Sequence, residues 1–206
     1  MMRSILIAAA LTAASCAVAA ADETGSRSGT GPASRSFGPV QPIPETQKAR
    51  LDKLFVELKR ATSEADAGLV ADQIRAEWRN SGSATIDLMM QWVADAEKKQ
   101  NFAAALDFLD QVTVLAPDYA EGWNQRATVH FVMHDYARSM ADIERTLALE
   151  PRHFGALAGL GAILQARGKK ALALKAYERL LAVYPMLRQA QDAVVKLTED
   201  LAGNPA

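Results

Sequence analysis

From Lys48 onward, the hydrophobic positions recur at helical spacing, without the strict alternation of a strand. A first apolar stripe falls at i, i+3, i+4 and i+7 of one helix: Leu51, Leu54, Phe55 and Leu58. A second stripe, formed by Val70, Ile74 and Trp78, follows Gly68 and would cover the first. Alanine, leucine, glutamate, lysine and glutamine dominate, and all of them favour helix. We therefore expect an all-α fold that begins with a helical hairpin at residues 48–83.

Three prolines mark an internal repeat, because Pro117, Pro151 and Pro185 lie 34 residues apart. Each closes a segment with the same plan, two helical stretches joined by a short turn. A constant period of about 20–50 residues is typical of repeat arrays, in which no single unit buries its apolar face alone. The spacing predicts three repeats at 84–117, 118–151 and 152–185. A capping helix at 186–201 and a short tail at 202–206 complete the chain.

The period and plan of these units resemble the tetratricopeptide repeat (TPR). The middle unit matches best, with Trp123, Ala127 and Tyr136 where the family has large, small and aromatic residues. The first unit is degenerate, since Val93 stands at a small position. Residues 48–83 lie one period further back without the small-residue signature. The resemblance implies a right-handed superhelical solenoid of antiparallel helix pairs with Trp123 in its core, where truncation to alanine would cost about 3–5 kcal/mol.

The resemblance also implies a partner-binding face, because fixed positions of each first helix line the concave side of a TPR array. Carried over to this sequence, the candidate residues are Glu121, Asn124, Thr128, Phe131, Val132, Met90 and Gln165. The Asn124 amide would hold a peptide backbone, Phe131 and Val132 would form an apolar wall, and Glu121 a negative rim. Alternatively, these residues face solvent or contact the N-terminal hairpin. The cationic clamp with which chaperone-binding members hold a C-terminal carboxylate is missing, since Met90 and Asn124 stand at such positions.

Composition argues against several other functions. The 206 residues carry 23 Lys and Arg against 24 Asp and Glu, so there is no basic field for nucleic acid. His130 and His134 are four residues apart, but the glutamate of a zinc-binding HExxH motif and a third ligand are lacking, so His130 is expected to be a packing residue. A phosphate-binding loop and a nucleophile with its base are also missing. We expect no metal, no cofactor and no catalytic activity.

The N-terminal end has the features of a secretory signal peptide at residues 1–21. Arg3 precedes an Ala- and Leu-rich run, and small residues at 19–21 suit cleavage. That run is too short for a membrane span, so none is expected in the mature chain. Residues 22–47, rich in Gly, Pro and Ser, predict a disordered linker. Cys16 leaves open a second, less favoured interpretation as the lipidation site of a membrane-anchored lipoprotein.

Together these patterns predict a non-catalytic protein–protein interaction adaptor of the bacterial periplasm or cell envelope, with a role in envelope integrity or complex assembly. Its partner would be a peptide or protein bound in the concave groove. Two alternatives stay open. The chain could be an accessory subunit of a cell-wall or protein quality-control enzyme, or a self-assembling scaffold that uses Trp78 and Trp92 of the N-terminal region as contacts.

Overall fold

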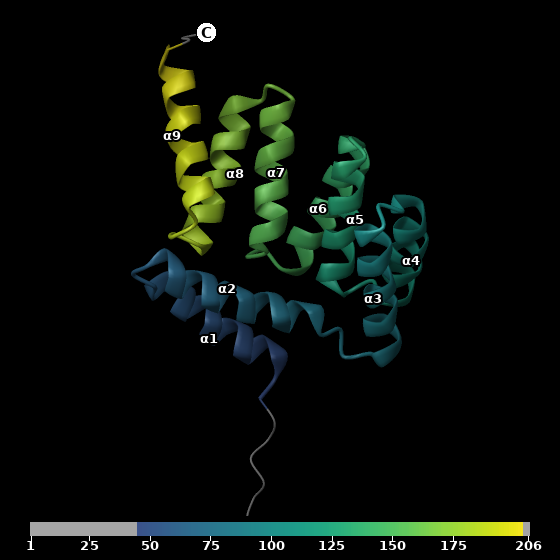
Figure 1. Ribbon diagram of the computed structural model, residues 1–206. Helices are drawn as coiled ribbons and strands as arrows, with labels where there is room; N and C mark the ends of the chain where they lie inside the picture. Colours follow the sequence, from purple (N-terminus) through teal and green to yellow (C-terminus); the bar gives the residue numbers. More distant parts are fainter. Residues whose placement is uncertain (1–44, 204–206) are drawn as a thin grey trace, which may run out of the picture. The chain divides into compact units, whose positions relative to one another are not determined.

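The computed structural model describes residues 45–203, which contain helices and no strands (Figure 1). Nine helices follow in this range: α1 Gln47–Arg60, α2 Glu64–Arg79, α3 Ala84–Lys98, α4 Phe102–Leu115, α5 Ala120–Val132, α6 Tyr136–Leu149, α7 Phe154–Ala166, α8 Lys170–Val183 and α9 Arg188–Gly203. The all-α prediction is confirmed. The expected signal peptide, Cys16 and nearly all of the linker lie outside the described residues.

The turns inside the three helix pairs repeat with the same period as the prolines. Gln100, His134 and Gly168 are 34 residues apart, and each adopts a positive φ of 55°, 60° and 70° respectively. Side-chain caps start the following helices in the first two pairs, where Asn101 and Asp135 accept hydrogen bonds from backbone N–H groups. Each pair is therefore closed by a left-handed residue that ends one helix just before the next begins.

The pairs α3–α4, α5–α6 and α7–α8 stand side by side as a solenoid (Figure 1). Ala105, Ser139 and Ala173 occupy one position of the repeat, and all three are fully buried. A β-carbon at Gly161 would lie only 2.7 Å from the Tyr177 ring, so a glycine is needed for α7 and α8 to approach. The predicted pairing of helices around small residues is confirmed. Helix α9 covers the exposed side of α8 with Ala190 and Leu197.

The α1–α2 hairpin does not stack in front of α3 as one more unit of the array. It runs across the lower ends of the other helices in Figure 1. Its buried residues, among them Leu58 and Ile74, share one apolar cluster with Leu157 and Leu180 of the third pair. Because the hairpin lacks the small residues that let units stack closely, its bulky face packs on the large side chains at the ends of α7 and α8.

Trp123 lies outside the core, contrary to the expectation from its place in the repeat. Its side chain is only partly buried, and its indole N–H donates to the Pro117 carbonyl oxygen at 3.1 Å. The Arg126 and Arg145 guanidinium carbons lie 4.7 and 5.8 Å from the ring centroid. The indole therefore packs between arginine side chains at the surface, where its polar N–H finds a partner.

Trp123→Ala is accordingly expected to lower the free energy of unfolding by about 1–2 kcal/mol, the sum of one hydrogen bond and a cation–π contact. Urea denaturation followed by circular dichroism measures the change. Leu157→Ala provides the comparison, because Leu157 is fully buried at the equivalent position of the next unit. That variant should lose about 2–5 kcal/mol. Equal losses in the two variants would show that Trp123 is a core residue after all.

Candidate functional site

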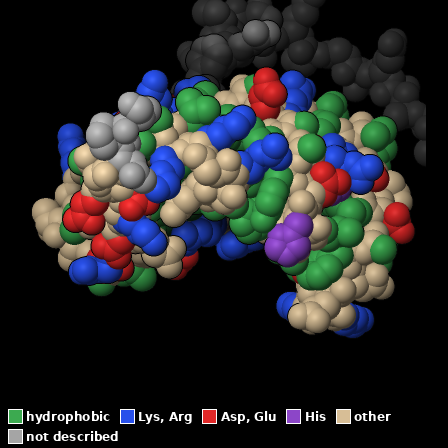
Figure 2. Space-filling model, turned by 90° about the horizontal axis from the view of Figure 1, so that it is seen from above, with side chains coloured by type: hydrophobic (Ala, Val, Ile, Leu, Met, Phe, Trp, Pro, Cys, Tyr) green, Lys and Arg blue, Asp and Glu red, His purple; other side chains and the backbone are tan. Residues whose placement is uncertain are grey.

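Helix α5 lies between two hollows on the concave side of the solenoid. The α5–α7 hollow, of about 150 Å³, is lined by residues of α5, α6 and α7. The α3–α5 hollow, of about 420 Å³, is lined by residues of α3 and α5 and by the end of α2. Seen from above in Figure 2, the described part is hollowed on one side, and hydrophobic side chains gather on one wall of that hollow.

The α5–α7 hollow brings together three of the predicted site residues. Asn124, Thr128 and Phe131 line it from α5, because they are spaced by four and three residues and share one helix face. Gly155 and Gly159 line it from α7 and leave the space open. Phe131 is partly buried, with its ring 5.7 Å from that of Tyr136. A hollow of this size with an apolar floor can take one small apolar side chain.

Asn124 is only partly free to bind a peptide backbone. Its Nδ2 donates to Glu121 Oε2 at 3.2 Å. Its Oδ1 makes no hydrogen bond with any other residue of the described part and stands next to Gly155, where an added β-carbon would lie 3.6 Å away. The amide can therefore accept one hydrogen bond from a ligand, in place of the two-fold contact that the sequence indicated.

Glu121 does not form a negative rim, and this prediction is corrected. Only 7% of the residue is exposed. Its carboxylate accepts hydrogen bonds from Asn124, from Gln125 Nε2 at 2.6 Å and from His153 Nε2 at 3.0 Å. A buried carboxylate needs such partners, since it has lost its water. Glu121 is thus a fixed element that positions the amides of α5.

His153 is the key residue that the sequence analysis missed. It caps α7, because its Nδ1 accepts the Ala156 N–H at 3.2 Å. The proton of the neutral ring must then sit on Nε2, which donates it to Glu121. The ring also stacks on Trp78 of α2, with centroids 4.0 Å apart and 13° between the planes. This one side chain joins α2, α5 and α7.

The α3–α5 hollow combines an apolar floor with acidic walls. Met90, the predicted site residue from the first unit, lines it together with Val93 and Ala94. Glu97 is half-buried on the same wall, and loss of water together with the nearby charge of Glu121 raises the pKa of its carboxyl group. Its side chain makes neither a hydrogen bond nor an ion pair within residues 45–203. A carboxylate held this way attracts a cation.

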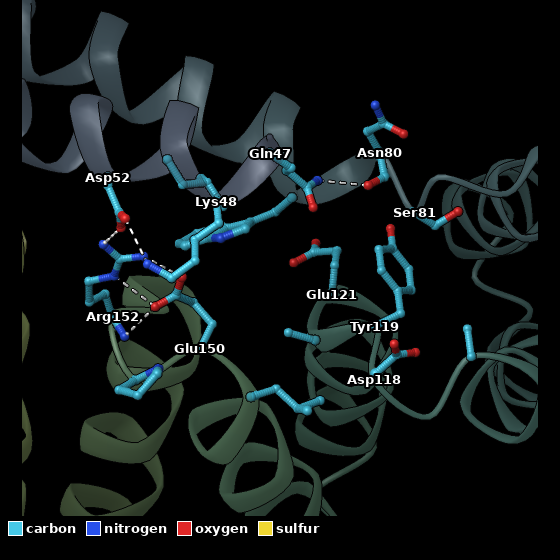
Figure 3. Close-up of a pocket in the computed structure, with 16 residues that line it drawn as sticks. Gln47, Lys48, Asp52, Asn80, Ser81, Asp118, Tyr119, Glu121, Glu150 and Arg152 are labelled. Carbon is cyan, nitrogen blue, oxygen red and sulfur yellow. Dashed lines mark hydrogen bonds and ion pairs between the residues drawn. The ribbon is translucent and has the colours of Figure 1, made fainter. Parts of the chain in front are cut away.

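A third, larger space separates α1 from the loops that precede α5 and α7, and we call it the hairpin cavity (Figure 3). It measures about 630 Å³ and meets the α3–α5 hollow at Asn80 and Glu121, which line both. Arg152 reaches Asp52 at 2.7 Å and Glu150 at 2.9 Å. Hydrogen bonds from Lys48 and Arg152 lower the pKa of the Asp52 carboxyl group. The charges on this side of the cavity are thus paired with one another.

The two other predicted site residues lie apart from these hollows. Val132, at the C-terminal end of α5, is 47% exposed. Gln165, near the end of α7, accepts a hydrogen bond from the Tyr177 hydroxyl at 3.5 Å. Neither lines the α3–α5 or the α5–α7 hollow. The seven predicted residues therefore divide between two neighbouring hollows and the far ends of two helices.

The two spaced histidines do not share a helix face. His130 is buried beside Asp142, with 3.9 Å between Nε2 and the carboxylate, and so is the packing residue that the sequence predicts. His134 is exposed in the left-handed turn that follows α5. Residues 45–203 hold no cluster of three or more potential metal ligands. No helix in this range is long and apolar enough to cross a membrane.

Comparison with known proteins identifies the family. A TPR repeat-containing protein of Rhizobium etli is 55% identical over 157 residues, which are 76% of this chain and 77% of that protein. The chain belongs to the TPR repeat-containing proteins. A scan against models of protein families gave no match.

Solved TPR domains share the fold at low sequence identity. The first TPR of Spaghetti (RPAP3), bound to the HSP90 peptide SRMEEVD, has a TM-score of 0.54 and 23% identity, over 57% of this chain and 93% of that one. The TPR2B domain of yeast Sti1, in complex with pHsp70, has a TM-score of 0.53 and 15% identity, over 57% and 99%. The Sgt2 TPR domain of Aspergillus fumigatus has a TM-score of 0.54 and 15% identity, over 60% and 87%. These TPR domains span little more than half of the chain.

Proposed function

We propose that this TPR protein is a non-catalytic adaptor that binds an extended segment of a partner protein along α5. The observation that carries the proposal is the α5–α7 hollow. Its polar and apolar groups, Asn124 Oδ1 and Phe131, lie about two helical turns apart on one face, and two glycines keep the opposite wall open. The TPR domains of Spaghetti and Sti1 were solved with a peptide and a protein partner, which supports this use of the fold.

The geometry suggests how such a segment would be held. A backbone N–H of the partner would donate to Asn124 Oδ1, whose amide is oriented by its bond to Glu121. A small apolar side chain of the partner would fill the hollow beside Phe131. An extended peptide exposes a backbone donor and a side chain at this kind of spacing, so one segment can use both contacts.

We place this adaptor in the bacterial periplasm or cell envelope, on the evidence of the N-terminal sequence. Residues 1–21 have the charge, the apolar run and the small residues of a cleaved signal peptide. Fractionation of the native cell tests this placement. Recovery in the soluble periplasmic fraction fits a cleaved signal, whereas a membrane fraction that is lost on Cys16→Ala fits lipidation.

The double variant Asn124→Ala/Phe131→Ala is expected to lose the partner while it keeps the fold. We would crosslink the tagged protein in its native envelope and compare the captured proteins with those of a matched variant, Gln189→Ala/Val195→Ala. These control residues are exposed on α9, far along the chain from α5. A partner that is captured by the wild type and the control but lost from the double variant supports the proposal. Equal capture by all three proteins would overturn it.

Self-assembly is the second candidate, and one observation favours it in a narrower form than the sequence indicated. Trp78 cannot be an oligomer contact, because it is only 7% exposed. Trp92, in contrast, is 45% exposed on α3, with its ring 5.4 Å from Phe108. A mass that rises with concentration in sedimentation, and that Trp92→Ser abolishes, would support this function.

A further inference from the structure

The α3–α5 hollow indicates the charge of the partner, an inference that rests on the proposed binding of a segment along α5. The hollow begins where the proposed contact ends, because Glu121 lines it and is bonded to Asn124. A segment that lies over Asn124 can therefore place a further side chain in this hollow.

The balance of charge in the hollow is negative. Three carboxylates line it, those of Asp87, Glu97 and Glu121, against the single guanidinium of Arg79. Asp87 and Glu121 are held in place, since Asp87 Oδ1 accepts from the backbone N–H and the hydroxyl of Ser81, and Glu121 accepts from His153 and two amides. Their charges cannot turn away from the hollow toward bulk solvent. A cationic group is the complement of such a surface.

Glu97 is the carboxylate with unused bonding capacity. It has lost part of its water by burial, and it lies close enough to Glu121 for the two charges to repel. Within the described part of the chain, no arginine or lysine pairs with it. The free protein therefore keeps an unfavourable carboxylate, which an incoming cation would stabilise.

The shape of the hollow selects a particular kind of cation. Met90, Val93 and Ala94 offer apolar surface below the acidic groups. Lysine and arginine side chains combine a hydrocarbon stem with a terminal charge, so the stem can cover this floor while the charge reaches Glu97. We propose that the α3–α5 hollow binds a lysine or arginine side chain of the partner segment.

Random octapeptides displayed on phage and selected on the full chain test this proposal. Selected sequences should be enriched in lysine or arginine at one position, and selection on Glu97→Gln should lose that enrichment. For a selected peptide, fluorescence anisotropy should show a Kd about tenfold weaker with Glu97→Gln. Replacing the basic residue of the peptide by norleucine should weaken binding by a similar factor, and the two changes together should add little more.

Two controls separate binding from folding. Glu97→Gln removes an unfavourable charge, so its melting temperature at pH 7 should be no lower than that of the wild type. Glu178→Gln changes an exposed glutamate of α8 and should leave the Kd unchanged.

The outcomes also separate this inference from the function on which it rests. Selected peptides without a basic preference, or with one that Glu97→Gln leaves intact, would overturn the inference. The function would still stand if Asn124→Ala/Phe131→Ala weakened those peptides. Peptides that bind equally well to that double variant would overturn the function itself, and with it the inference.

Discussion

His153→Ala is expected to lower the free energy of unfolding by about 3–5 kcal/mol. The change leaves the buried carboxylate of Glu121 without its ring N–H donor, and α7 without the group that caps its first turn. It also removes the ring that stacks on Trp78. Breaking one side of a buried polar pair costs far more than the pair contributes, because the remaining group keeps its desolvation penalty. Urea denaturation monitored by tryptophan fluorescence measures the loss.

His153→Asn distinguishes the two roles of this residue. Asparagine can cap the helix but does not reach Glu121, so this variant should recover about 1 kcal/mol of the loss. In the double variant His153→Ala/Glu121→Gln the orphaned charge is gone, and the combined loss should be at least about 1 kcal/mol smaller than the sum of the single losses. Additive losses would mean that His153 and Glu121 do not interact.

Trp78→Ala is expected to be nearly as damaging, with a loss of about 3–5 kcal/mol. The indole is buried between Phe154, at 4.7 Å between ring centroids, and the stacked ring of His153. Its removal would leave a cavity under the α1–α2 hairpin at the place where α2 meets the third helix pair. Hydrogen exchange should then become faster through residues 47–79, in addition to the overall loss of stability.

Trp78→Phe is the informative control for that prediction. The Trp78 Nε1 is buried and has no hydrogen-bond partner in the described part of the chain. Phenylalanine therefore sacrifices no hydrogen bond and loses only volume, so the cost should stay below about 2 kcal/mol. A loss as large as that of Trp78→Ala would contradict this account, because it would show that the N–H is bonded in solution.

The helix pairs could be predicted from the sequence because their determinants are local. A repeat of 34 residues fixes which helices pair, and small residues at one position, such as Ala105 and Ala173, show where they approach. The place of the hairpin could not be predicted in this way. Its apolar stripe shows only that a partner surface exists, whereas the partner itself, at Leu157 and Leu180, lies about a hundred residues further along the chain.

The same division applies to the candidate site. Asn124, Thr128 and Phe131 come together because spacing along one helix places them on one face, and this was predictable. The true role of Glu121 was not, since it depends on a histidine from the next unit that reaches back to the carboxylate. A lone histidine after Pro151 gives no signal of such a contact in a single sequence.

The crossing hairpin also changes how the protein must fold. In a simple repeat array each unit contacts only its neighbours, so folding can begin anywhere and the ends can fray independently. Here, Arg152 pairs with Asp52, 100 residues away, and Arg188 with Glu64, 124 residues away. Such non-local contacts slow folding, since a long loop must close before they form. The hairpin is made first on the ribosome, yet its apolar face stays uncovered until the last helix pair has been synthesised.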